Sequence, residues 1–268
     1  MNTALKLQNV PEWLINTTKQ EQKIEVSLPK AAHERVSSIY NFLDTELIIA
    51  YTIEAAKNRG FNLTVKKIVK VRSKTGLGKH FVIFGTGLFI GEGHTKSELT
   101  LTVQNSADGL SAARFILGMI VALCSNGLFA CIPAVQPERV LHKGMTYQNV
   151  EQAVNKMFDR LEALQNFAER LQSIQLNNEQ IQAFTKQALE IRGLKDVSPE
   201  YTTIDKARRI EDQNNTAWSV FNRVQENLTK GFRVIQGGKI KQVQALRSPA
   251  SDFKMNVQLM DAVYKLIA

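Results

Sequence analysis

Residues 105–128 read NSADGLSAARFILGMIVALCSNGL, and this stretch decides the expected fold. Asp108 is a good helix N-cap, and the glycine after it allows a tight turn. Residues 112–124 are almost wholly apolar, with Arg114 as the only charge. The Asn-Gly pair at 126–127 tolerates the left-handed conformation that ends helices. The stretch therefore predicts one buried helix at the centre of the core, with its polar ends as scaffold.

Three strand candidates precede the predicted helix, at residues 63–72, 79–90 and 98–104. All are rich in β-branched or aromatic residues, which suit a half-buried pleated surface. The links 73–78 and 91–97 are short and contain Gly, so hairpins are the economical connection. The third candidate alternates, which predicts an inward face (Leu99, Leu101, Val103) and an outward face (Thr100, Thr102, Gln104).

The whole pattern predicts an α+β fold. A helix over 45–59 comes before an antiparallel sheet of three or slightly more strands, which packs on the buried helix. Residues 128–142, with two prolines, either add an edge strand or cross the surface. Apolar residues spaced by three and four predict further helices over 147–171, 178–192, 203–228 and 256–267.

The expected organisation has three parts. An N-terminal arm covers 1–40, an α+β core covers 41–144, and a mostly helical region covers 145–268. The last part contains a basic Gly-rich loop at 229–248. The helical half either forms its own unit or packs back on the sheet.

The composition is basic, with 34 Lys and Arg against 25 Asp and Glu, which gives a net charge of +9. This balance favours nucleic acid, or less often an anionic membrane, as the partner. A solubilising charge without any partner is the alternative. The longest apolar run, residues 115–124, is too short to span a bilayer, and no signal peptide opens the chain. We therefore expect a cytoplasmic protein with no membrane partner.

Metal, cofactor and catalytic signals are weak. The two cysteines lie in apolar surroundings, and the four histidines have no ligand spacing with them, so neither a metal nor a cofactor is expected. Cys124 with His142, or Asp108 with Glu138 and Lys143, form unspecific sets. The Gly85-Thr-Gly87 pattern lies inside a strand and opens no helix. An enzyme is not expected, although a nuclease stays open.

The first basic cluster holds six cations and no acid: Lys66, Lys67, Lys70, Arg72, Lys74 and Lys79. On a regular strand Lys66, Lys70 and Arg72 share one face, and the opposite face is mostly apolar. Such a sheet packs on a helix with one side and meets phosphates with the other. The alternative is a solvated face whose lysines deter aggregation.

A second basic cluster lies in the Gly-rich loop and comprises Lys230, Arg233, Lys239, Lys241 and Arg247. The loop either becomes ordered on a phosphate chain or stays a flexible surface segment. Phe232 is the aromatic residue we expect to stack on a base, a contact that contributes about 1–3 kcal/mol. Phe81, Phe84 and Phe89 are weaker candidates, because strand phenylalanines usually belong to the core.

Several motifs resemble a phage- and plasmid-borne family catalogued as domain of unknown function 932. The N-S-x-D-G-x-S-A turn at 105–112 and the V-x-x-C-S-N-G-L stretch at 121–128 carry the likeness. A His-x-Gly at 142–144, a W-x-x-x-N-x-x-x-E region at 218–226 and the final helix extend it over roughly 40–268. Leu110 after the Asp-Gly pair is a small departure. The family has no settled activity.

The expected element order is also similar to the core of phage single-strand annealing proteins of the RecT and Red-beta type. This likeness implies DNA held in a basic groove, oligomers along the strand and no nucleotide hydrolysis. The function hypothesis is therefore a single-stranded DNA-binding, strand-annealing protein of phage or plasmid recombination, with the two basic clusters tracking the backbone. The alternative is a mobile-element protein that binds and inhibits a host defence protein.

Overall fold

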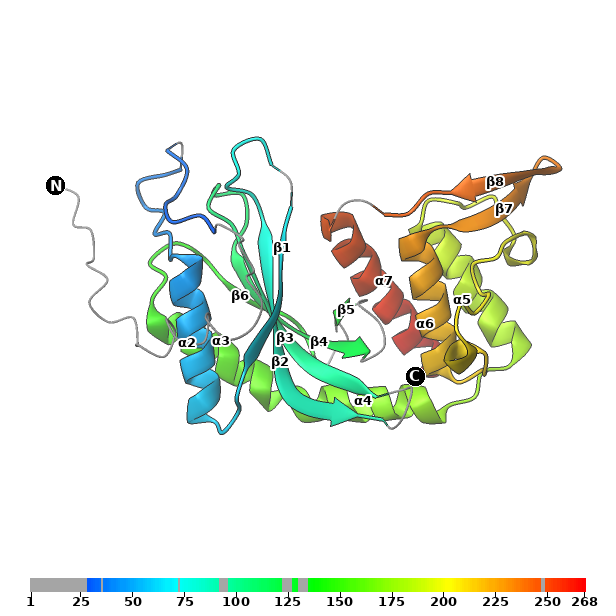
Figure 1. Ribbon diagram of the computed structural model, residues 1–268, viewed down its shortest axis with the longest axis horizontal. Coiled ribbons are helices and arrows are strands. Elements are labelled where there is room, and N and C mark those ends of the chain that lie inside the picture. Colours follow the sequence, from blue (N-terminus) through cyan, green and yellow to red (C-terminus); the bar gives the residue numbers. More distant parts are fainter. Residues whose placement is uncertain are drawn as a thin grey trace.

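The computed structural model describes residues 28–34, 36–71, 73–91, 96–121, 127–129, 135–246 and 249–268. Within them, a six-stranded antiparallel sheet is followed by helices and a separate two-stranded hairpin (Figure 1). The sheet strands are β1 (Thr64–Lys70), β2 (His80–Ile90), β3 (Ser97–Asn105), β4 (Ala113–Val121), β5 (Gly127–Phe129) and β6 (Glu138–Val140). The helices are α2 (Thr45–Asn58), α3 (Tyr147–Asp159), α4 (Leu161–Ser173), α5 (Asn178–Ile191), α6 (Ala217–Lys230) and α7 (Pro249–Ile267). The hairpin consists of β7 (Phe232–Gln236) and β8 (Lys239–Val243).

The α+β class and the antiparallel sheet are confirmed, but the predicted buried helix is wrong. Its apolar residues form β4, which pairs with β3, β5 and β6. A strand covered on both faces reads as a continuous apolar run, which periodicity cannot distinguish from a buried helix. Asp108 is consequently not an N-cap, and its Oδ1 accepts the Leu110 N–H at 3.0 Å inside the β3–β4 connection. The expected helix stop falls on residues 122–126, outside the described part, and on Gly127, which begins β5.

The sheet is covered on both sides. We call its first face the one that carries Val82, Phe84, Leu101, Val103 and Phe115, which pair in register. Helices α2 and α3 lie on this side (Figure 1). The second face carries the neighbouring residues, among them Phe81, whose ring centroid lies 5.8 Å from that of Phe253 in α7.

The polar residues of β3 were predicted to face solvent, and this expectation is wrong. Thr100, Thr102 and Gln104 are only 2%, 1% and 3% exposed, because they lie on the covered second face. Gln104 has a partner there, since its Nε2 donates to the Ala112 carbonyl at 3.5 Å, whereas Thr102 Oγ1 has no hydrogen-bond partner among the described residues. The alternation of apolar and polar residues in β3 therefore predicted correctly which side chains share a face, but not that both faces are buried.

The helical half differs in detail from the pattern. One predicted helix over 147–171 is two helices, α3 and α4, that meet at Arg160. The predicted helix over 203–228 begins only at Ala217, where the Thr216 side chain accepts the Ser219 N–H. One buried apolar core continues from α2 through the sheet to α7, so the two parts of the chain pack together.

The expected basic loop at 229–248 is a hairpin over most of its length. Gly237 and Gly238 adopt φ values of 59° and 70°, which a two-residue type I′ turn requires. Strands β7 and β8 pair from Phe232 and Val243 to the turn. Among the helices of the described residues, none is long and apolar enough to cross a membrane.

Candidate nucleic-acid interface

The connection between β3 and β4, residues 105–112, fixes the geometry of one end of the sheet. Asn105 is fully buried, and its Nδ2 donates to Thr45 Oγ1 at 2.9 Å. The same hydroxyl lies 2.7 Å from His80 Nε2. This buried polar contact ties the end of β3 and the start of β2 to the first residue of α2. The first residue of the N-S-x-D-G-x-S-A motif thus has a structural role.

The rest of this connection binds two further segments. The Ala107 N–H donates to the Leu77 carbonyl at 2.9 Å, which joins the connection to the β1–β2 link. The Tyr40 hydroxyl donates to the Ser106 carbonyl at 2.9 Å, and Ser106 Oγ lies 2.9 Å from Ser111 Oγ. Residues ahead of α2 are therefore held against the connection, and a surface forms from parts of the chain that are distant in sequence.

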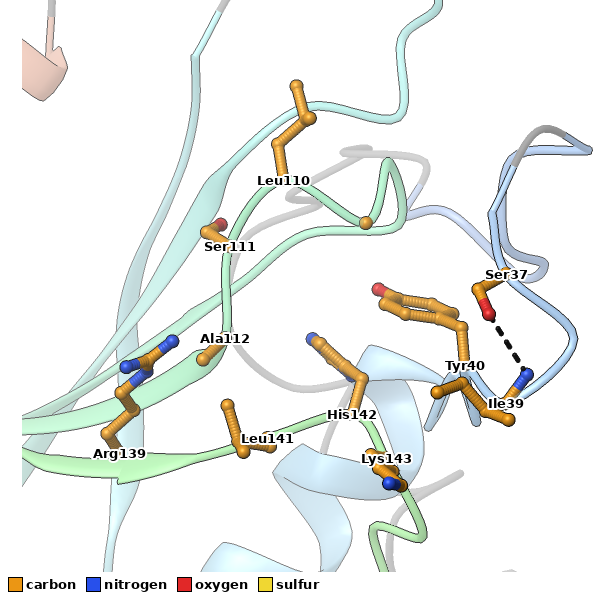
Figure 2. A pocket seen from close by; sticks show the side chains of 11 residues that line it. Ser37, Ile39, Tyr40, Leu110, Ser111, Ala112, Arg139, Leu141, His142 and Lys143 are labelled. Atoms are coloured by element: carbon orange, nitrogen blue, oxygen red, sulfur yellow. Dashed lines mark hydrogen bonds between the residues drawn. The ribbon is translucent and has the colours of Figure 1, made fainter.

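A cavity of about 300 Å³ lies on this surface. Its lining comes from three segments, as Figure 2 shows: Ser37, Ile39 and Tyr40; Gly109, Leu110, Ser111 and Ala112; and Arg139, Leu141, His142 and Lys143. The second and third segments contain the D-G-x-S-A and H-x-G motifs that sequence analysis noted separately. The structure brings these two motifs to one cavity, which the sequence alone did not predict.

His142 and Tyr40 form the inner wall of the cavity. Their ring centroids lie 4.8 Å apart, and the Asn41 N–H donates to the His142 carbonyl at 2.7 Å. Burial lowers the pKa of His142, while the nearby Asp108 carboxylate acts in the opposite direction. Burial, with a smaller contribution from Asp108, raises the pKa of Tyr40 to about 12. Both side chains are therefore neutral near pH 7.

Two arginines lie side by side at the edge of the cavity. Arg114 on β4 pairs in register with Arg139 on β6, and both side chains are exposed. Directly opposed like charges destabilise a sheet. Within the described part of the chain, no carboxylate forms an ion pair with either guanidinium. Glu138, the acid next in sequence, lies on the first face and binds Arg160 at 2.7 Å.

The first basic cluster does not form the regular basic face that alternation predicted. A β-bulge between Val65 and Lys67 shifts the pleat, so Lys66 and Lys67 both leave the first face. Lys66 Nζ lies 3.2 Å from the Glu98 carboxylate across the sheet. Lys70 and Lys74 are exposed and Lys79 is half-buried, whereas Arg72 lies outside the described residues.

The second cluster is distributed over the hairpin. Phe232 is 2% exposed and belongs to the core, so it is not available to stack on a base. Lys230 is paired with the buried Glu226 carboxylate. Arg233, Lys239 and Lys241 are exposed, and Lys241 Nζ contacts Gln236 Oε1 at 3.0 Å. Arg247 lies outside the described residues.

The other candidate aromatic residues divide between core and surface. Phe81 and Phe84 are 4% and 0% exposed, as expected for strand phenylalanines. Phe89 is 48% exposed, and its ring lies 4.5 Å from Lys96 Nζ. Phe89 is thus the candidate that keeps an accessible ring, although it lies at the opposite end of β2 from the cavity.

The W-x-x-x-N-x-x-x-E region forms a buried polar network rather than a surface. Glu226 is 3% exposed and lies 3.3 Å from Arg209, which also binds Asp212 at 3.0 Å. Arg223 donates to the carbonyls of Asp212 and Asn214. These bonds fasten the irregular segment before α6 to that helix, so the motif is structural.

The described residues form no cluster of metal ligands at the cavity. In the described ranges no three His, Cys, Asp or Glu side chains are placed to hold a metal ion. Cys124, which the sequence pattern offered as a partner for His142, lies outside these ranges. The arrangement offers instead two kinds of contact, cationic groups at an exposed edge and a neutral aromatic wall beside them.

Two curated proteins of Escherichia coli (strain K12) resemble the chain. The UPF0380 protein YfjQ is 33% identical and the UPF0380 protein YafZ 32% identical, each over 160 residues. Each match covers 58% of this chain and 58% of the relative, so the chain spans little more than half the length of these relatives. No solved structure matches the chain. A protein-family profile described as "Domain of unknown function (DUF932)" matches residues 32–263, which is most of the chain, and the protein belongs to this family.

Proposed function

We propose that the protein binds single-stranded DNA at the end of the sheet marked by Arg114 and Arg139. The observation that carries the proposal is this pair of exposed arginines in direct register. Holding two like charges opposite one another costs stability, and a bound phosphate backbone removes that cost. The net charge of the whole chain, +9, also favours an anionic partner.

Further cations lie at the same end of the sheet. The row that contains Arg114 and Arg139 continues to Gln104 and Phe81 on the second face. The adjacent row ends in Lys70, which pairs with His80 at the edge strand β1. With strands about 4.8 Å apart, the step from β1 through β2, β3 and β4 to β6 is about 19 Å. Lys70 projects from the first face and the two arginines from the second, so a strand of nucleic acid would meet both only by passing around this end of the sheet.

Strand annealing is proposed as a consequence of such binding. Backbone contacts leave bases free to pair with a second strand, and this step requires no nucleotide hydrolysis. The likeness to annealing proteins of the RecT type assumed a long helix after three strands, and that element is β4. That likeness therefore gives no support here, and annealing in phage or plasmid recombination and oligomers along the strand stay predictions. The net charge supports only the binding of an anionic strand.

Titration of a labelled oligodeoxynucleotide, followed by fluorescence anisotropy, tests the proposal. We expect tight binding at low salt that weakens steeply towards physiological salt. The double variant R114A/R139A removes the central contacts. K186A/K195A is the matched control, since it removes the same charge from exposed positions in and after α5. Absence of binding at low salt to single strands and duplexes would refute the proposal.

A second candidate function, binding of a host protein, is favoured by the hairpin. Ile235 and Ile240 face each other across β7 and β8 and are 47% and 71% exposed. An exposed apolar pair at the tip of a hairpin suits a protein contact. The variant I235T/I240T keeps β-branched residues on both strands, so a complex that forms through this pair should be lost without loss of the fold.

A further inference from the structure

We propose that the cavity beside Arg139 is a nucleotide site, which receives one base together with its phosphate. The inference rests on the proposed function and deepens it, because it assigns one position of the bound strand to a built pocket. Three independent features of the cavity support a ligand of this composition: an unpartnered buried imidazole, an apolar wall and a cationic rim.

The first feature is His142. Its side chain is only 4% exposed, and neither Nδ1 nor Nε2 has a hydrogen-bond partner among the described residues. Figure 2 shows its ring directed into the space between Ala112 and Tyr40. A buried polar group without a partner costs stability unless something binds it. One of the two ring nitrogens, as donor or acceptor according to the tautomer, can pair with one group on the edge of a base.

The second feature is the apolar wall. Ile39, Leu110 and Leu141 all line the cavity and are 60%, 83% and 55% exposed. Nine large hydrophobic side chains are exposed in the described part of the chain, and three of them gather here. An exposed apolar cluster beside charged residues marks a binding surface. The face of a base would cover these side chains. A free inorganic anion would leave them exposed to water.

The third feature is the charge at the rim. Arg139 and Lys143 line the cavity, and Arg114 lies beside Arg139. Neither lining cation has an acidic partner within the described residues. The nearby acid, Asp108, does not line the cavity, and one of its oxygens accepts the Leu110 N–H. A purely apolar ligand would leave these cations unused, whereas a phosphate would bind them.

The size of the cavity is sufficient for a small ligand such as one base with its phosphate. A volume of about 300 Å³ lies at the lower end of the range for small-molecule pockets. Two sources share the required chemistry, namely a free nucleoside monophosphate and a nucleotide within or at the end of a strand.

Calorimetric titration of the full chain with dAMP, deoxyadenosine and inorganic phosphate tests the ligand class. We expect saturable binding of dAMP and at least tenfold weaker binding of the two halves. Equal binding of dAMP and inorganic phosphate would overturn the base contact, and so would an absence of dAMP binding together with unaltered strand binding by H142F. The inference would also be overturned if a peptide with an apolar side chain and a carboxylate competed for the cavity and dAMP did not.

Two variants identify the site. H142F keeps a ring of similar size and removes both nitrogens, so dAMP affinity should fall about tenfold. L110S should weaken binding, whereas L88S, at an exposed leucine on β2, should not change it. Thermal unfolding of H142F confirms that the variant is folded. Wild-type affinity of both H142F and L110S for dAMP would place the nucleotide elsewhere and contradict the inference.

Oligonucleotides with a 5′-phosphate and with a 5′-hydroxyl distinguish the two sources. A preference for the phosphorylated end that H142F abolishes assigns the pocket to a strand terminus. Equal binding of both, with H142F weakening both, assigns it to an internal nucleotide. Loss of dAMP binding in H142F with no oligonucleotide binding by the wild type supports a free nucleotide, and then the proposed function fails while the pocket stands.

Discussion

At the scale of single residues, the roles of the motif side chains come from contacts that sequence spacing does not report. Asp108 is of a residue type that often caps helices, yet its side chain accepts a hydrogen bond in a turn between two strands. His142 is one histidine among four in the sequence, and only its position beside Tyr40 and the β3–β4 connection makes it a candidate ligand group. The sequence contains the motifs that line the cavity, but their assembly depends on the long-range pairing of β4 with β6.

Asn105→Ala should lower the free energy of unfolding by about 1–3 kcal/mol, because it removes a buried hydrogen bond to Thr45 Oγ1 and a longer, part-buried one to the Leu43 carbonyl. Chemical denaturation measures this change. Asn62→Ala is the control, since Asn62 is exposed just before β1. Equal effects of the two substitutions would show that the buried contact contributes nothing specific.

The lowered pKa of His142 gives stability a pH dependence of known sign. The folded state keeps His142 neutral below the unfolded value of about 6.5, so only the unfolded state gains a proton there. Wild-type stability relative to H142F should therefore decrease as the pH falls below about 6.5. Other buried groups titrate in both proteins, so their contributions cancel in this difference. They are His80, whose pKa burial also lowers, and Asp212 and Asp252, whose pKa values burial raises. A difference that does not vary with pH would contradict the burial of His142.

At the scale of elements, hydrophobic patterning predicted α2, the first three strands and most helical segments, since each has one buried face or stripe. It failed where both faces are covered, as in β4, and where a bulge shifts the pleat, as between Val65 and Lys67. It also read the Gly-rich segment at 229–248 as a loop, although two adjacent glycines between alternating strands favour a type I′ hairpin.

The glycines of the hairpin region should differ in their tolerance of a side chain. Gly238→Ala meets no atom within 4 Å, and only its φ of 70° is strained, so a cost of about 1 kcal/mol is expected. Gly231→Ala has a φ of 93° and places Cβ 2.5 Å from the Val243 carbonyl oxygen, so about 3 kcal/mol is expected. Thermal unfolding compares them, and an equal cost would contradict the close approach of β8 to Gly231.

At the scale of the whole molecule, the sheet and the helical half share one core. The Phe61 and Phe158 rings stack with centroids 4.3 Å apart, and Arg59 binds Asp159 at 2.6 Å. A fragment of residues 41–144 would expose the apolar first face that α3 covers. We expect that this fragment shows no cooperative unfolding by near-ultraviolet circular dichroism, whereas the full chain does. Cooperative unfolding of the fragment would establish an independent domain.

The salt dependence of DNA affinity tests the central claim most directly. For single strands the slope of log K against log salt changes by about 0.7 for each phosphate contact, so R114A/R139A should reduce its magnitude by about 1.4. K186A/K195A should retain the wild-type slope, because its lysines lie on and after α5, away from the paired arginines. Anisotropy titrations over a series of salt concentrations give all three slopes. A wild-type slope in R114A/R139A, or an equal reduction in K186A/K195A, would contradict binding at the paired arginines.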